Sequence, residues 1–288
     1  MRYCKPPHPD PRRPRLRLPP GACDAHCHVF GPADRFPYAP GRTYTPPDSP
    51  KARLKALHDR LGIERAVLVQ ASCHGTDNRA TLDAIAASGG RYRGVAIVDP
   101  AISDAGLAAL DRGGIRAARF NFVAHLGGTP DLPAFERMLA RIAPLGWHVV
   151  LHLDAADILD HAERIKRIRM PFVIDHMCRI KAKGGIDQLP FRMLLELMRN
   201  PNACVKISGA ERITEAGPPY RDVAPFAAAL VAAAPARVLW GTDFPHPNVE
   251  DMPDDGDLVD LLAELVPDDA LRRRILVDNP ARLYGFPD

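Results

Sequence analysis

Short apolar runs alternate with amphipathic stretches along the whole chain. Each apolar run has the length of a strand and is rich in aliphatic residues. Near-continuous runs of this kind are typical of strands buried on both faces of a parallel sheet. Eight of them predict eight parallel strands, over residues 22–30, 65–72, 92–100, 115–122, 147–154, 171–178, 203–209 and 237–245.

The stretches between these runs predict helices, of which the clearest cover residues 77–88, 131–145, 155–167, 190–199 and 220–234. Asp131 and Asp154 stand where helix N-caps are expected. Eight strand–helix units in one undivided chain predict a single (β/α)8 TIM barrel of the α/β class. An open, doubly wound sheet is the alternative. It is disfavoured because no Gly-x-Gly-x-x-Gly or P-loop motif follows the first strand.

The 288 residues are a normal length for one such barrel. We expect the barrel domain to cover residues 21–288, after an arm rich in Pro and Arg over residues 1–20. A basic arm can bind an acidic partner, but a Pro-stiffened segment lying on the barrel is the favoured interpretation.

Composition narrows the classes of partner. The net charge is +3, from 38 basic and 35 acidic residues, so we expect no binding to nucleic acid or membranes. No run approaches the ~18 apolar residues that span a bilayer. The start of the sequence lacks the apolar core of a signal peptide, so a cytoplasmic location is expected. The six cysteines form no Cys-x-x-Cys pair and are expected to be free thiols. No pattern indicates an oligomeric state.

Polar residues gather at the ends of the predicted strands, where barrel enzymes carry their catalytic groups. The first run contains His26 and His28, which share one strand face because side chains alternate. The same alternation predicts that Cys23, Ala25 and Cys27 face the helices. Two imidazoles at this spacing can bind one metal ion or polarise one carbonyl, although His-x-His alone is a weak signal.

Later strand ends make the set more specific. His152 on the fifth run is predicted to face the lumen, His176 ends the sixth, and Asp243 ends the eighth. Arg119, near the end of the fourth run, is expected to face the lumen and to bind an anionic group. The same alternation along the seventh run predicts that Lys206 also faces the lumen. Together these residues predict an active site at one mouth of the barrel.

Longer motifs resemble the 2-pyrone-4,6-dicarboxylate lactonases of the amidohydrolase superfamily. They are DAHCHVFGP at 24–32, RFPYAP at 35–40, YTPP at 44–47 and GTDFPHPN at 241–248. The resemblance runs from about Ala22 to the end of the chain. It implies a barrel that opens a lactone ring with water, uses the aspartate at position 243 as general base and needs no metal.

The resemblance also implies roles for other residues. His26, His28 and His176 match the family's catalytic histidines. Substrate contacts are implied for Tyr44, Ser72, Arg119, Arg212 and Asn248. Arg179 follows the sixth strand and is a further expected cation at the barrel mouth.

Two positions depart from the lactonase pattern. His125 stands where a second carboxylate-binding arginine is expected, so it becomes a candidate substrate contact. This change makes the related 4-sulfomuconolactone hydrolases serious candidates. His152 stands where these lactonases have a tyrosine, and a histidine there is the usual superfamily metal ligand. Two alternatives therefore remain, namely a metal-free mechanism and a zinc-type ion bound by His26, His28, His152 and Asp243.

The expected activity is hydrolysis of a small anionic lactone from aromatic-compound catabolism, such as 2-pyrone-4,6-dicarboxylate or 4-sulfomuconolactone. A metal-dependent decarboxylase is the alternative, because the superfamily includes barrels with a similar ligand set.

Overall fold

Eight parallel strands form the centre of the computed structural model, which describes residues 2–287. Each strand pairs with its neighbour in chain order, as a (β/α)8 barrel requires. The prediction of a TIM barrel is confirmed. The strands are β2 (Cys23–Cys27), β4 (Arg65–Val69), β5 (Tyr92–Ala96), β6 (Ile115–Asn121), β7 (His148–His152), β8 (Phe172–Ile174), β9 (Ala203–Lys206) and β10 (Val238–Leu239).

The first and last strands close the barrel through backbone hydrogen bonds. The amide of Ala25 donates to the carbonyl of Trp240 at 2.9 Å, and the amide of Asp243 donates to the carbonyl of His26 at 2.8 Å. This closure holds the ends of β2 and β10 side by side. It therefore brings the His-x-His motif against Asp243 across more than 200 residues of sequence.

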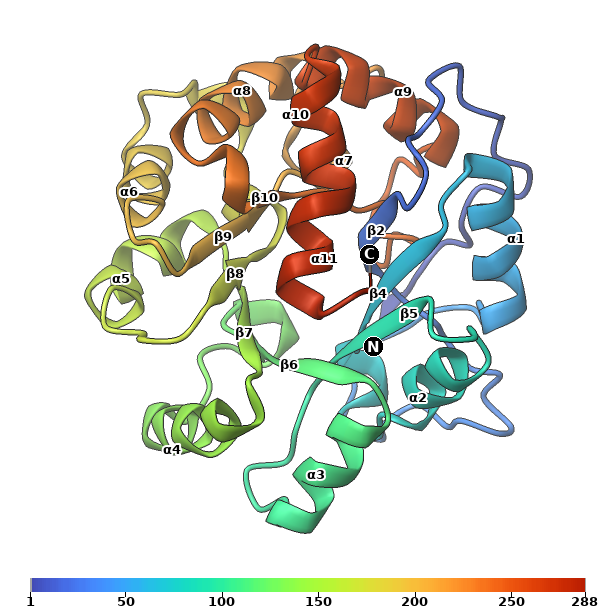
Figure 1. The fold of residues 1–288 in the computed structure, drawn as a ribbon, viewed down its shortest axis with the longest axis vertical. Coiled ribbons are helices and arrows are strands. Elements are labelled where there is room, and N and C mark those ends of the chain that lie inside the picture. The colour runs from blue at the N-terminus through green and yellow to red at the C-terminus, as the bar shows by residue number, and fades with distance from the viewer. Residues whose placement is uncertain (1, 288) are drawn as a thin grey trace.

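Eight helices surround the strands (Figure 1). The five that the sequence indicated most clearly are present, and Asp131 and Asp154 cap two of them as predicted. Three more complete the ring: α1 (Lys51–Leu61), α3 (Asp104–Arg112) and α9 (Asp255–Leu265). The five clear helices are α2 (Arg79–Ala86), α4 (Leu132–Ile142), α5 (Ala155–Ile165), α6 (Leu189–Leu197) and α8 (Ala224–Ala233). Shorter helices are α7 (Ala210–Ile213), α10 (Asp269–Arg273) and α11 (Asn279–Tyr284).

The barrel interior holds a small apolar cluster, separate from the larger core between strands and helices. In Figure 1, α11 crosses one end of the barrel, and Tyr284 belongs to the interior cluster. Cys23 and Ala25 also lie in this cluster, so the prediction that they face the helices was wrong. The pairing of β2 with β4 shifts register between Asp24 and Cys27, which breaks the simple alternation. Cys27 does face the helix layer as predicted.

The N-terminal segment lies against the barrel. Its strand β1 (Arg2–Tyr3) pairs with β3 (Tyr44–Thr45), beside one of the predicted substrate contacts. Farther along, Arg12 donates to Asp260 of α9 at 2.6 Å and forms a second ion pair with Asp257. These contacts agree with the favoured interpretation of the arm. The boundary at residues 20 and 21 stays a prediction.

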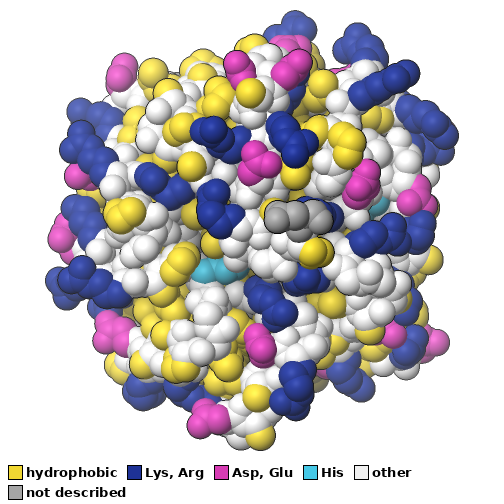
Figure 2. Space-filling model, viewed as in Figure 1, with side chains coloured by type: hydrophobic (Ala, Val, Ile, Leu, Met, Phe, Trp, Pro, Cys, Tyr) yellow, Lys and Arg dark blue, Asp and Glu magenta, His cyan; other side chains and the backbone are white. Residues whose placement is uncertain are grey.

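Figure 2 shows one face on which Lys and Arg side chains are spread among acidic ones instead of forming a single patch. All six cysteines are free thiols in the described chain, as predicted. Within residues 2–287, no helix has both the length and the apolar character needed to cross a membrane.

Candidate active site

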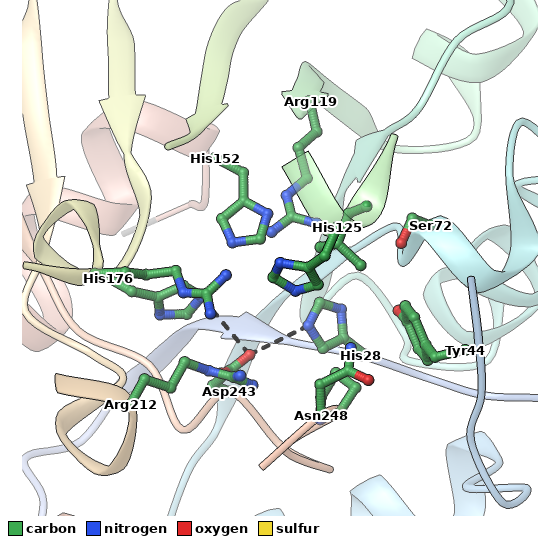
Figure 3. A pocket seen from close by; sticks show the side chains of 13 residues that line it. His28, Tyr44, Ser72, Arg119, His125, His152, His176, Arg212, Asp243 and Asn248 are labelled. Carbon is green, nitrogen blue, oxygen red and sulfur yellow. Dashed lines mark hydrogen bonds and ion pairs between the residues drawn. The ribbon is translucent and has the colours of Figure 1, made fainter. Parts of the chain in front are cut away.

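A pocket is formed by residues that lie at the ends of strands or follow them. Every residue predicted to bind substrate lines it, namely Tyr44, Ser72, Arg119, His125, Arg179, Arg212 and Asn248. His28, His152, His176 and Asp243 line it as well (Figure 3). His26 is the exception among the predicted histidines, since it is fully buried and is not among the lining residues. Leu126 and Pro247 also line the pocket and were not predicted.

Asp243 is the centre of the site. Its Oδ2 accepts a hydrogen bond from Arg212 Nε at 2.5 Å. Its Oδ1 lies 3.3 Å from His28 Nε2, 3.6 Å from His26 Nε2 and 3.7 Å from His176 Nε2. Figure 3 shows Asp243 among His28, His176 and Arg212. Burial alone would raise the pKa of Asp243, but Arg212 and the imidazoles outweigh it and hold the pKa well below its usual range.

His176 reaches Asp243 because β8 ends early. The strand predicted over residues 171–178 stops at Ile174, and four residues from His176 to Arg179 adopt positive φ values between 49° and 57°. For residues other than glycine, this left-handed backbone conformation costs roughly 1–2 kcal/mol per residue. Gly209 packs against the turn, where an added Cβ would lie 3.0 Å from the His176 ring. Strain of this kind is typical of functional sites.

Burial keeps the imidazoles of His176 and His152 mostly neutral. Desolvation lowers the pKa of His176 to about 4, and its Nδ1 lies 2.9 Å from Ser208 Oγ. Desolvation, helped by Arg119, also holds the pKa of His152 well below its usual range. A neutral imidazole can both donate and accept a hydrogen bond, which suits it to contact a substrate carbonyl or a metal ion.

Beneath the pocket, buried charges compensate one another. Lys206 is fully buried, and its Nζ lies 3.0 Å from Oδ1 of Asp175 and 3.0 Å from Nδ1 of His26. The other oxygen of Asp175 accepts hydrogen bonds from Arg119 Nε at 3.2 Å and Nη2 at 3.1 Å. Side-chain alternation predicted that Lys206 faces the lumen but indicated no role for it. The pairing of Lys206 with Asp175 was not predicted.

Three of the four predicted metal ligands come together. Ligand atoms of His26, His28 and Asp243 lie within 4.8 Å of one another. His152 is not part of that group among the described residues, and its ring centroid lies 6.1 Å from that of His176. The residues of this centre could therefore hold one ion, while His152 faces the pocket.

A second buried cluster flanks the site. His246 Nε2 lies 3.0 Å from Asp255 Oδ1, and His246 Nδ1 lies 3.6 Å from Glu211 Oε1. Glu211 is also 3.6 Å from Arg212 Nε, which leads to Asp243. Burial would lower the pKa of His246, but Asp255 and Glu211 raise it to about 10. His246 belongs to the GTDFPHPN motif, which was the available signal for this cluster.

A model of the amidohydrolase family matches residues 23–286 of the chain. The chain belongs to the amidohydrolase family. It is 48% identical over 285 residues to a 2-pyrone-4,6-dicarboxylate hydrolase of Comamonas testosteroni, covering 96% of this chain and 93% of that protein. It is 44% identical over 275 residues to a 4-sulfomuconolactone hydrolase of Hydrogenophaga intermedia, covering 94% and 91%.

Solved structures show the same architecture. A Pseudomonas putida protein assigned to the 2-pyrone-4,6-dicarboxylic acid hydrolases superposes with a TM-score of 0.84 at 33% identity. The match covers 94% of this chain and all of that one. The resemblance noted in the motifs is therefore confirmed for both lactone hydrolase groups.

Proposed function

We propose that this amidohydrolase opens the ring of a small anionic lactone by adding water, with Asp243 as the general base. One observation carries the proposal: a buried, ionised carboxylate stands among three imidazoles on the floor of a pocket lined by arginines. The named activities of the two similar hydrolases support the same chemistry.

The pocket favours a substrate with carboxylate or sulfonate groups. Arg119, Arg179 and Arg212 all line it, and guanidinium groups bind such anions through paired donors. Of these arginines, Arg179 has a single ion pair within residues 2–287, with Asp154, which is 38% exposed. We infer that Arg119 and Arg179 hold the acid groups.

The reaction follows from the placement of Asp243. Arg212 binds Oδ2 at 2.5 Å, whereas Oδ1 has only the longer contacts with the imidazoles, so we infer that Oδ1 accepts the proton from water. The resulting hydroxide attacks the lactone carbonyl, and the imidazoles and arginines of the pocket stabilise the negative charge on the carbonyl oxygen. The ring C–O bond then breaks, and the leaving oxygen takes up the proton held by Asp243. The product is the ring-opened acid.

The spacing of His26, His28 and Asp243 also fits a divalent ion. The His28–Asp243 separation of 3.3 Å and the His26–Asp243 separation of 3.6 Å are close to the ~3.3–3.4 Å between ligands of a tetrahedral zinc site with 2.0–2.1 Å bonds. His28 donates its Nδ1 hydrogen to the carbonyl of Val69 at 2.7 Å, the usual support of a metal-binding histidine. His26, His28 and Asp243 would hold the ion, and it would lower the pKa of a bound water.

A screen of substituted lactones tests the proposal. Ring opening would be followed by absorbance, with and without a chelator, and release of carbon dioxide would be measured in parallel. We expect ring opening of lactones that carry carboxylate or sulfonate groups and slow turnover of neutral ones. Carbon dioxide release without ring opening would favour the decarboxylase instead.

A further inference from the structure

We propose that Lys206 fixes the tautomer of His26, so that His26 carries its hydrogen on Nε2, turns this N–H toward Asp243, and is a poor metal ligand. This positioning role for a buried lysine rests on the proposed function only in taking Asp243 as the base.

The contact between Lys206 and His26 determines the direction of the hydrogen bond. Lys206 Nζ lies 3.0 Å from His26 Nδ1 with hydrogen-bond geometry. An ammonium group has three donors and no acceptor, so Nδ1 must accept. A neutral imidazole that accepts at Nδ1 carries its hydrogen on Nε2. An imidazolium would carry hydrogens on both nitrogens and is incompatible with this contact.

Asp175 offers the only competing partner for His26 Nδ1 among the described residues. Its Oδ1 is 3.2 Å away, but it lies nearer to the Lys206 ammonium, at 3.0 Å. Arg119 holds the other oxygen of Asp175. Asp175 therefore balances the charge of Lys206, and a further hydrogen of the ammonium points to His26 Nδ1.

His28, the other histidine of the His-x-His motif, has different partners. Its Nδ1 lies 2.7 Å from the carbonyl of Val69 and carries a hydrogen, because a carbonyl only accepts, while its Nε2 makes a second hydrogen-bond contact with Asp243 Oδ1 at 3.3 Å. His26 Nε2 has no hydrogen-bond partner in the described chain and lies 3.6 Å from Asp243 Oδ1. An N–H turned toward that oxygen is attractive, so Lys206 acts on Asp243 through His26.

This arrangement opposes metal binding at a centre whose spacing otherwise fits an ion. A metal ligand must present a lone pair, and His26 presents a hydrogen. To bind an ion through Nε2, His26 would have to move its hydrogen to Nδ1, against the ammonium of Lys206. The positive charge of Lys206 adds repulsion. We infer that the metal-free site is complete and that Lys206 keeps it so.

Nuclear magnetic resonance of the unmodified enzyme tests the tautomers directly. The protein would be labelled with ¹⁵N-histidine, freed of metal with a chelator, and studied by long-range ¹H–¹⁵N correlation, with His26→Gln and His28→Gln to assign the signals. We expect His26 protonated on Nε2 and His28 protonated on Nδ1. A His26 signal protonated on Nδ1, or on both nitrogens, would overturn the proposal.

Zinc affinity of Lys206→Met gives a second, independent readout. Methionine has a similar length but cannot donate to His26. We expect its zinc affinity, measured by competition with a chromogenic chelator, to rise by about tenfold or more, the usual scale for partners of metal ligands. The matched control is Lys55→Met on α1, where Lys55 is 55% exposed. It should bind zinc like the parent.

An unchanged zinc affinity in folded Lys206→Met would contradict the proposal. If this variant fails to fold, the histidine tautomers measured in the parent enzyme still test the proposal. Neither readout uses lactone turnover. A protein with the expected tautomers but no lactone hydrolysis would refute the proposed function and leave the role of Lys206 standing.

Discussion

Asp243→Asn isolates the proposed base with little change of shape. The amide keeps one oxygen that can accept a hydrogen bond, but it cannot take a proton from water. In the parent, Arg212 and the imidazoles hold the pKa of Asp243 well below its usual range, so the carboxylate is ionised throughout the neutral range. The substitution therefore removes a base that is fully available in the parent.

The magnitude has two parts. General base catalysis typically contributes 10²–10⁴-fold, so we expect kcat to fall by about that factor. Breaking a buried ion pair typically costs roughly 3–5 kcal/mol. Here Glu211 Oε1 remains 3.6 Å from Arg212 Nε, and the asparagine oxygen can still accept from Arg212. We therefore expect a smaller loss of folding free energy, about 1–3 kcal/mol.

The assay compares initial rates of lactone opening with urea unfolding of the same samples. Asp59→Asn is the matched control, because Asp59 is 60% exposed on α1 and, within residues 2–287, forms its only ion pair with the surface residue Lys55. It should change neither quantity noticeably. If Asp243→Asn stays folded and retains kcat within a few-fold of the parent, Asp243 is not the base.

Three further outcomes are expected. Arg119→Met should raise KM for anionic lactones at least tenfold while neutral lactones are affected less, because it removes a charged, paired contact; equal effects on both would contradict the anion-binding role. Folding stability, from urea unfolding at a series of pH values, should fall as the pH drops from about 6.5 toward 4, by about 1.4 kcal/mol per unit for His176 alone. The sign follows because the unfolded imidazole takes up a proton that the folded one, with a pKa of about 4, does not; constant stability over this range would refute it. Gly209→Ala should lower stability by more than about 1 kcal/mol, because Gly209 has φ of 74° and faces the His176 ring, and unchanged unfolding would show that the turn adapts.

The barrel and much of its site followed from local patterns. Along β6, β7 and β9 each side chain points opposite to its neighbours, so parity alone placed Arg119, His152 and Lys206 inside the barrel. Parity is a property of the extended backbone and needs no knowledge of distant residues. The motifs around His26 and Asp243 then indicated the lactone hydrolase groups, which the comparisons confirm.

Tertiary structure decided what parity could not. The register shift in β2 turns Cys23 and Ala25 inward, and the left-handed turn after β8 aims His176 at Asp243. Both depend on how the chain closes against strands far away in sequence. Lys206 meets His26 across 180 residues, and a contact of this kind has no local signature. On the regular strands the sequence determined which side chains enter the barrel, while the tertiary structure determined the inward face of β2 and which buried side chains pair with one another.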